Sequence, residues 1–125
     1  MSFKEQVQKA IVLLQEDSAA IEQEAQSLGE KIYNTHPIIY IASDKEGLAI
    51  RFRQQLNENA KILCHHHVVP EMNHNELVGR AGGNEKYSVL RMQTRSDHPK
   101  VTQRIAINKE IIAKYTPHQY DMIAK

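Results

Sequence analysis

Apolar residues recur at alternating steps of four and three along the first part of the chain. Ser2 and Glu5 form a capping-box pattern. The repeat then runs through Val7, Ile11, Leu14, Ser18, Ile21, Ala25 and Leu28. This spacing gathers the apolar side chains on one narrow face of a helix, and Gly29 stands where a C′ glycine would end it. The pattern therefore predicts one long helix over residues 3–28, whose apolar seam needs a partner surface.

Three later segments have the character of strands. Pro37 to Ala42 is apolar without alternation, as is typical of a parallel strand covered on both faces. Residues 62–69 and 87–92 are the other two predicted strands. A fourth strand is expected to begin near Tyr120, where the chain breaks off, so the domain is expected to be incomplete at the C-terminus.

Helices are predicted between these strands. Ser43 or Asp44 is expected to cap a helix whose apolar side carries Leu48, Ala49, Phe52, Leu56 and Ala60. A short helix is expected around residues 75–79, followed by an Ala81–Asn84 loop. Asp97 and Pro99 start a last helix, on which one face carries Val101, Ile105, Asn108, Ile112 and Tyr115. The alternation predicts an α/β fold, a three-layer α/β/α sandwich around a parallel sheet with ligands at the carboxyl ends of its strands.

Composition narrows the class of protein. The chain has 125 residues, of which 41% are apolar and 25% charged, as expected for one compact domain. A net charge of +1 gives no field that would attract nucleic acid, so no nucleic-acid partner is expected. The apolar stretches are too short to span a bilayer and residues 2–9 are too polar for a signal peptide, which favours a cytoplasmic protein with no membrane partner. Cys64, the single cysteine, is interpreted as a buried strand residue.

Glu58 is the first candidate for chemistry. It lies near the end of its predicted helix, about 180° around the helix from Ala49, so its carboxylate should point away from the apolar face. Unpaired carbonyls at a helix C-terminus create a negative potential that works against a charged carboxylate, although Lys61 would offset it. From spacing alone, a solvated surface glutamate is favoured over a general base.

His74 is the second candidate, because it follows the carboxyl end of a predicted strand. Its neighbours Asn73 and Asn75 could fix its tautomer or contact the hydroxyl groups of a ligand. Asparagine also caps helices. The simpler interpretation therefore makes Asn73 the cap and His74 a first-turn residue, with Glu71 and Glu76 as acids favoured by the helix dipole.

A histidine run suggests a metal site, since Cys64, Glu71 and His74 lie near His65, His66 and His67. Successive strand residues face opposite sides of a sheet, so at most His65 and His67 could converge. None of the usual zinc patterns is present, and we expect no metal site. The sequence also lacks a Gly-x-Gly-x-x-Gly or Walker loop and a motif for acyl transfer, which argues against nucleotide binding and nucleophilic catalysis.

Two motifs together resemble a known family. Residues 57–61 read Asn-Glu-Asn-Ala-Lys and residues 70–79 read Pro-Glu-Met-Asn-His-Asn-Glu-Leu-Val-Gly. In this order and spacing they resemble the C-terminal domain of the bacterial and archaeal bifunctional phosphoglucose/phosphomannose isomerases. The segments 38–40, 90–91 and 97–101 also look like that family, so the likeness covers roughly residues 37–115 and outweighs the simpler interpretations.

The resemblance implies a sugar isomerase (SIS) domain within a longer two-domain subunit. Residues 1–36 would form a connector helix and loop, and residues 37–125 a partial C-terminal SIS domain. It further implies a homodimer with active sites at the subunit contact. The implied reaction interconverts glucose 6-phosphate, and in these bifunctional enzymes mannose 6-phosphate, with fructose 6-phosphate. No cofactor is expected.

The resemblance also assigns roles to the two candidates. Glu58 would take the proton from C2 and return it to C1 through a cis-enediol, and His74 would assist ring opening in the neighbouring subunit's site. Nothing here resembles the Ser/Thr-rich phosphate loop of the family's first SIS domain, so the substrate-binding residues are unknown and the isolated chain should be nearly inactive. The alternatives are a non-catalytic, regulatory SIS module that binds sugar phosphates and a metal-binding domain.

Overall fold

The computed structural model describes residues 1–83 and 85–124. Contacts divide the chain into two compact units with a boundary between Tyr33 and Asn34. No helix within the described residues is long and apolar enough to cross a bilayer. The candidate side chains Glu58 and His74 both belong to the second unit.

The first unit contains two helices, α1 (Phe3–Glu16) and α2 (Ser18–Ile32). The capping box is confirmed, since the Glu5 amide donates to Ser2 Oγ and the Ser2 amide donates to Glu5 Oε2. The prediction of one long helix is wrong, because α1 ends and α2 begins at Asp17. Gly29 does not end the helix either. The repeat continues through it to the buried Ile32.

The second unit is built on a four-stranded parallel sheet. Its strands are β1 (His36–Ala42), β2 (His65–Val69), β3 (Tyr87–Thr94) and β4 (Gln119–Ala124), in the order β2-β1-β3-β4. The parallel arrangement confirms the sequence prediction. The fourth strand, expected only to begin, pairs with β3 from Val89↔Gln119 to Thr94↔Ala124.

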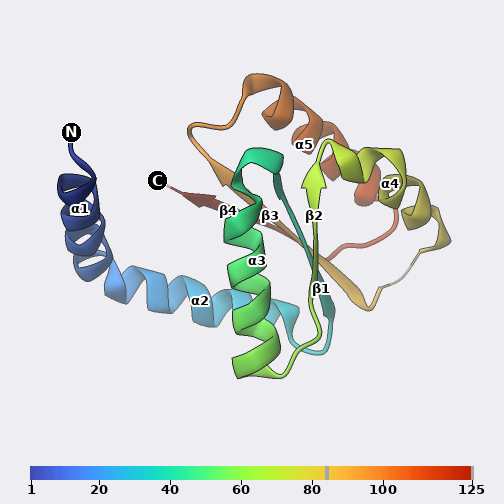
Figure 1. The fold of residues 1–125 in the computed structure, drawn as a ribbon. Coiled ribbons are helices and arrows are strands. Elements are labelled where there is room, and N and C mark those ends of the chain that lie inside the picture. The colour runs from blue at the N-terminus through green and yellow to red at the C-terminus, as the bar shows by residue number, and fades with distance from the viewer. Residues whose placement is uncertain (84, 125) are drawn as a thin grey trace. The chain divides into compact units, whose positions relative to one another are not determined.

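Helices cover both faces of this sheet (Figure 1), which confirms the α/β/α layering. They are α3 (Glu46–Gln55), the short α4 (Glu76–Gly79) and α5 (Pro99–Ile112). Ser43 and Asp44 do not cap α3, because they belong to a 3₁₀ turn, η1 (Ser43–Lys45), that precedes it. The predicted Ala81–Asn84 loop begins in a 3₁₀ turn, η4 (Arg80–Gly82), and Asn84 lies outside the described residues.

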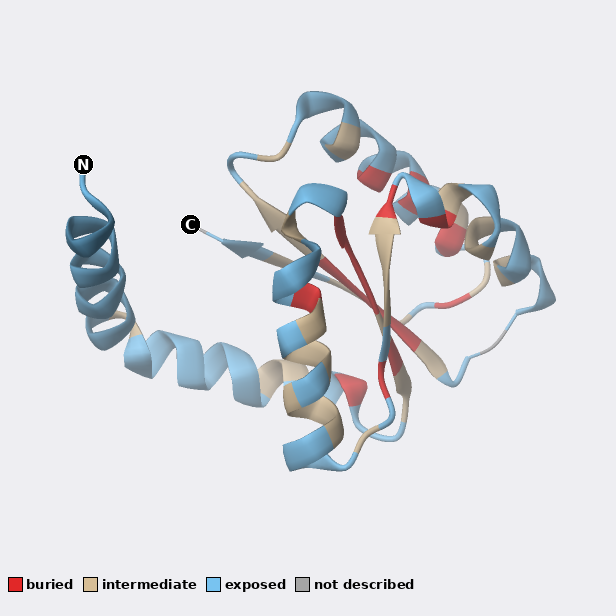
Figure 2. Ribbon diagram, in the orientation of Figure 1, coloured by how far each residue is buried: buried red, intermediate tan, exposed pale blue. Residues whose placement is uncertain are grey.

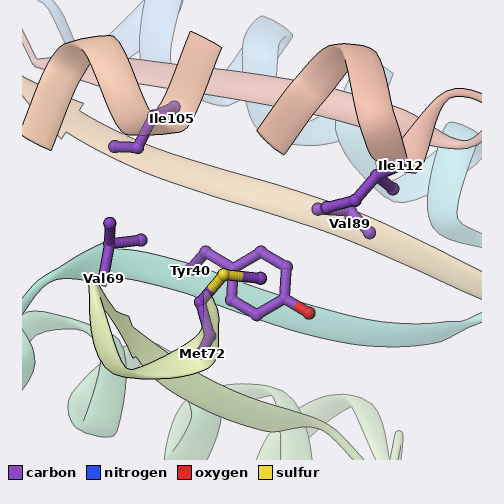
Figure 3. Packing of buried hydrophobic residues seen from close by; sticks show 6 residues of the cluster. All are labelled: Tyr40, Val69, Met72, Val89, Ile105 and Ile112. Carbon is purple, nitrogen blue, oxygen red and sulfur yellow. The ribbon is translucent and has the colours of Figure 1, made fainter. Parts of the chain in front are cut away.

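The core lies between the sheet and the helices (Figure 2). One cluster of buried side chains joins β1, β2, the turn after β2 and β3 to α5, and consists of Tyr40, Val69, Met72, Val89, Ile105 and Ile112 (Figure 3). The predicted inner face of α5 is confirmed by the buried Ile105, Asn108 and Ile112. On α3 only Ala49 is buried, and Leu48 is 54% exposed. The buried face of α3 is therefore narrower than the sequence predicts.

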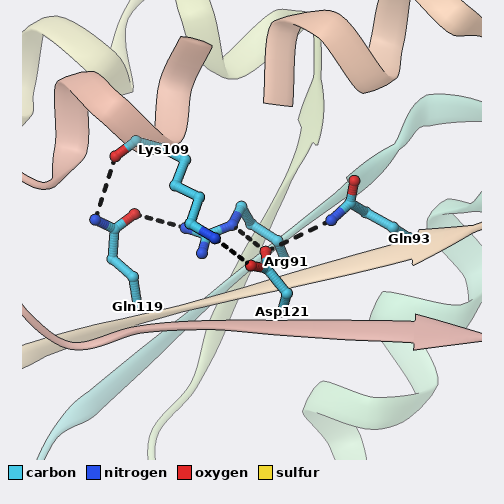
Figure 4. Close-up of polar contacts among 5 residues, drawn as sticks. All are labelled: Arg91, Gln93, Lys109, Gln119 and Asp121. Atoms are coloured by element: carbon cyan, nitrogen blue, oxygen red, sulfur yellow. Dashed lines mark hydrogen bonds and ion pairs between the residues drawn. The ribbon is translucent and has the colours of Figure 1, made fainter. Parts of the chain in front are cut away.

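Polar contacts attach the edge strand β4 to β3. Arg91 is 1% exposed, and it donates from Nε to Asp121 Oδ1 at 2.5 Å and from Nη1 to Gln119 Oε1 at 2.6 Å (Figure 4). Lys109 on α5 donates to the other carboxylate oxygen of Asp121 at 2.6 Å. Although burial alone would raise the pKa of Asp121, these two cations hold it below its usual value.

Candidate functional site

Glu58 lies in a π-helical turn, η2 (Leu56–Ala60), that directly follows α3. Such turns are rare in proteins as a whole, and many of those that occur lie at functional sites. Lys61 ends the turn in the left-handed region, with φ 57°, and its Nζ donates to the Glu58 backbone carbonyl. Asn57 Oδ1 accepts a hydrogen bond from the Cys64 amide at 2.9 Å, which closes the loop that leads into β2. The backbone around Glu58 is therefore held from both sides.

The Glu58 side chain itself is exposed. It stands away from the packed side of α3, where Ala49 is fully buried, as the helical spacing predicts. Lys61 contacts the carbonyl of Glu58, and across the described residues no ion pair engages the Glu58 carboxylate. The carboxylate can therefore approach a molecule bound at the surface.

His74 closes a 3₁₀ turn, η3 (Glu71–His74), that follows β2. Its side chain is 72% exposed, and Nδ1 lies 3.4 Å from Oε2 of Glu71. A carboxylate beside Nδ1 favours the tautomer that carries its proton there and leaves Nε2 free to exchange protons with a ligand. The sequence interpretation considered Glu71 as a first-turn acid and as a neighbour of the histidine run, and it missed this contact.

The two asparagines beside His74 have roles that differ from the expected ones. Asn75, not Asn73, caps α4, because its Oδ1 accepts from the Glu76 amide at 2.6 Å. Asn73 instead donates to Oδ1 of Asn108 on α5 at 2.7 Å, and Asn108 donates back at 3.3 Å. In the sequence, the only indication of this contact was that Asn108, a polar residue, lies on the predicted apolar face of α5.

The fold separates the two candidates along the sheet. In a parallel β1-α3-β2 unit the helix runs opposite to the strands, so Glu58, just after α3, lies at the amino edge of the sheet. β2 points toward α4 (Figure 1), and His74, in the turn η3 that follows the end of β2, lies at the carboxyl edge. The five residues of β2 span roughly 15 Å. The two side chains of one chain are therefore too far apart to act on neighbouring atoms of one small molecule.

The histidine run does not converge. His65 Nδ1 lies 2.7 Å from Nε2 of His36, His66 pairs with Glu46 at 3.2 Å, and His67 Nδ1 lies 3.6 Å from Glu76. Burial and the neighbouring His65 lower the pKa of His36. Among the residues that the structure describes, no three His, Cys, Asp or Glu side chains gather to hold a metal ion. Cys64 is buried as predicted, but it precedes β2 and does not belong to the strand. Burial raises the pKa of its thiol to about 11.

The strand order reverses between β1 and β3, and ligands of open α/β sheets often bind at the carboxyl ends of such strands. Here an ion pair lies at those ends, between Lys45 Nζ and Asp97 Oδ1 at 2.9 Å. Asp97 also accepts hydrogen bonds from the amide and hydroxyl of Thr94. It therefore does not start α5, whose cap is His98.

A cleft of about 330 Å³ opens elsewhere in the second unit. Its polar wall carries Arg80, which donates to the Tyr40 hydroxyl at 2.7 Å and lies over the Tyr40 and Tyr87 rings. Neither Glu58 nor His74 lines this cleft. The candidate chemistry thus lies on two exposed turns and outside the cavity.

Comparisons with known proteins agree with this fold. The family described as bacterial phospho-glucose isomerase C-terminal SIS domain matches residues 21–124. A bifunctional phosphoglucose/phosphomannose isomerase from Aquifex aeolicus is 29% identical over 114 residues, 90% of this chain and 36% of that protein. One from Thermoplasma volcanium is 32% identical over 107 residues, 84% of this chain and 35% of that protein.

A D-glucosamine-6-phosphate 4-epimerase from Sulfolobus acidocaldarius is 30% identical over 115 residues, 90% of this chain and 36% of that protein. The chain thus spans about a third of the length of these curated relatives. Among solved structures, a proposed phosphosugar isomerase from Clostridium difficile 630 superposes with a TM-score of 0.63 at 16% identity, over 97% of this chain and 34% of that one. That similarity shows the fold. The chain belongs to the bacterial phospho-glucose isomerase C-terminal SIS-domain family.

Proposed function

We propose that this chain supplies the proton-transferring groups of an aldose–ketose isomerase that acts on hexose 6-phosphates. Its substrates would be glucose 6-phosphate and mannose 6-phosphate, with fructose 6-phosphate as product. The observation that carries the proposal is the exposed carboxylate of Glu58, which forms no ion pair with any residue that the structure describes and lies on a π-helical turn. The named activities of the Aquifex aeolicus and Thermoplasma volcanium relatives support the substrate class.

The proposed reaction consists of proton transfers. His74 moves a proton between the ring oxygen and the C1 hydroxyl, which opens the sugar ring. Glu58 then takes the proton from C2 while O1 gains a proton from water, which gives a cis-enediol. Glu58 returns its proton to C1 as O2 loses one to water, so a single carboxylate must reach both carbons. The Glu71 carboxylate beside Nδ1 of His74 would keep Nε2 directed to the substrate.

The separation of Glu58 and His74 along the sheet favours shared active sites. We propose that each site combines Glu58 of one subunit with His74 of its partner in a homodimer. An isologous dimer of this kind has two such sites, and each subunit contributes to both. The phosphate group would be held outside residues 37–125, and residues 1–36 would connect this domain to the rest of a longer subunit. The isolated chain should be nearly inactive for that reason.

The test follows solvent deuterium into C2 of the substrate. The assay uses a two-domain enzyme. This is either the complete protein or a chimera in which residues 21–124 replace the matching segment of the Aquifex aeolicus relative. Glu58→Gln keeps the shape of the side chain and removes the base, so exchange should stop. Glu110→Gln changes an exposed glutamate on α5 and should leave exchange unaltered. Exchange at the original rate in Glu58→Gln would show that Glu58 is not the base.

The same assay separates the alternatives. A non-catalytic module that senses sugar phosphates would bind fructose 6-phosphate without any exchange at C1 or C2. The epimerase named among the relatives suggests glucosamine 6-phosphate as a second substrate to test, with product analysis at C4. Exchange at C2 with formation of the ketose supports the proposed isomerase activity. Inversion at C4 alone would show that the activity is that of an epimerase.

A further inference from the structure

A pair of amides, in which Asn108 is buried and Asn73 is half-buried, joins the turn that carries His74 to the core. Asn73 Nδ2 donates to Asn108 Oδ1 at 2.7 Å, and Asn108 Nδ2 donates to Asn73 Oδ1 at 3.3 Å. Asn108 is only 3% exposed, and its Nδ2 also lies 3.3 Å from the sulfur of the fully buried Met72. Two antiparallel hydrogen bonds between planar groups fix both the separation and the relative rotation of the two amides.

Helix α5 holds the Asn108 side of this amide pair in place. Asn108 lies on the inner face of α5 between Ile105 and Ile112, whose side chains belong to the buried cluster in Figure 3. A buried amide that loses its partner has no water to replace it, so the pair strongly favours one arrangement of the turn. Met72, also in η3, belongs to the same buried cluster and attaches the turn to the core by apolar packing.

His74 depends on this anchoring because its own side chain is little constrained. The imidazole is 72% exposed, and its recorded polar partner is Glu71, which belongs to the same turn. A shift of the turn would carry Glu71 and His74 together, so their contact cannot hold the ring in place relative to the sheet. Asn73 is the residue adjacent to His74, and its bonds to Asn108 connect that turn to α5.

We infer that Asn108, through Asn73, is a positioning residue for His74. The inference rests on the proposed role of His74 in ring opening and extends it to a residue on a different element that touches no substrate. A proton donor must lie within hydrogen-bonding distance of the ring oxygen, and small displacements are costly for such transfers. Loss of Asn108 should therefore impair ring opening selectively and leave proton transfer by Glu58 unaffected.

The kinetic test is a double-mutant cycle in the two-domain enzyme. Asn108→Val, His74→Ala and the double variant are assayed with the cyclic sugar phosphate and with an analogue that lacks the ring-closing hydroxyl. Asn108→Val should lower kcat for the cyclic sugar by about tenfold or more, with KM and turnover of the analogue nearly unchanged. In the His74→Ala background it should have no further effect. Equal losses with both substrates, or effects that multiply in the double variant, would overturn the inference.

A matched control separates positioning from simple destabilisation. Ile105→Val removes a buried methylene group from the same face of α5, one turn before Asn108, and leaves the amide pair intact. Thermal unfolding shows how far each variant is destabilised. At a comparable loss of Tm, Ile105→Val should keep its turnover of the cyclic sugar. A similar kinetic defect in both variants would contradict a specific role for Asn108.

A second readout does not depend on activity. In enzyme labelled at the histidine ring carbons, the NMR signal of His74 should shift or broaden in Asn108→Val and stay unchanged in Ile105→Val. An unchanged His74 signal in Asn108→Val would overturn positioning by Asn108. A shifted signal together with equal losses in His74→Ala for cyclic and open substrates would instead refute the ring-opening role while leaving the anchoring intact.

Discussion

Glu58 and His74 lie at opposite edges of one parallel sheet, with the length of β2 between them. This follows from topology alone, because Glu58 comes at the end of the helix that precedes β2 and His74 comes just after β2. Two groups placed in this way can serve one substrate only if different chains supply them. The fold thus gives a physical reason for the dimer that we propose.

The role of His74 predicts a substrate-dependent defect. His74→Ala in the two-domain enzyme should reduce turnover of the cyclic sugar by about 100-fold, the usual size of a lost general acid–base contribution. Turnover of an open-chain analogue should fall much less, because Glu58 remains. Steady-state rates with both substrates check this. His118→Ala, at a half-buried histidine in the segment before β4, is the matched control and should change neither rate. A loss of the same size for the two substrates contradicts ring opening by His74.

Asn57 is predicted to support Glu58. Asn57→Ala removes the oxygen that accepts from the Cys64 amide, so the π-helical turn should loosen and the free energy of unfolding should fall by about 1 kcal/mol. Turnover should drop about tenfold with little change in KM, because the base is misplaced while binding is retained. Asn59→Ala breaks only the exposed contact to Gln55 and should have a smaller effect on turnover. If both variants lose turnover equally, the contact of Asn57 does not position the base.

Asp121 is predicted to stabilise the fold in a pH-dependent way. Burial alone would raise its pKa, but Arg91 and Lys109 lower it, so Asp121 stabilises the folded state above the ordinary aspartate pKa of about 3.9. This contribution is lost as the pH falls further, through the lowered native value. Asp121→Asn should therefore cost about 2 kcal/mol of unfolding free energy at pH 7, and the cost should shrink below about pH 4.

Denaturant unfolding of this chain at pH 7 and at low pH measures that difference. Asp44→Asn is the control, because Asp44 also pairs with a lysine but its side chain is 73% exposed. Exposed pairs contribute less than about 1 kcal/mol, so the control should change little at either pH. A cost for Asp121→Asn that is independent of pH would show that its carboxylate charge is not what stabilises the edge strand.

Two isoleucines on α5 test the placement of the core. Ile112 is fully buried in the cluster beneath α5, whereas Ile107 is 50% exposed on the same helix. Ile112→Ala should lower the free energy of unfolding by about 3 kcal/mol, and Ile107→Ala by less than about 1 kcal/mol. Denaturant unfolding of the two variants gives both values. Similar losses would mean that α5 packs through another face.

Much of the sheet could be predicted from the sequence because strand burial leaves a clear pattern. β1 is an unbroken apolar run from Pro37 to Ala42, since both of its faces are covered, and α5 repeats apolar residues at helical spacing. β4 is harder to recognise because its polar residues Gln119 and Asp121 bond to Arg91 on β3. That partner lies 30 residues away from Asp121 in the chain, so no local pattern reveals it.

The details around the candidate residues were less predictable. The π-helical turn at Glu58 and the break at Asp17 depend on backbone geometry that the apolar repeat does not encode. The pairing of Asn73 with Asn108 joins two elements that are 35 residues apart. The motifs identified Glu58 and His74 through resemblance, and the fold then explained why they stand apart.

Complementation between two inactive subunits tests the shared site most directly. Glu58→Gln and His74→Ala subunits of the two-domain enzyme are co-expressed with different tags, and mixed dimers are purified through both. In each mixed dimer one site should combine an intact Glu58 with an intact His74, so activity should return to about half of the wild-type value. If both groups of a site come from one chain, both sites stay defective, and mixed dimers no more active than the parents would contradict the account.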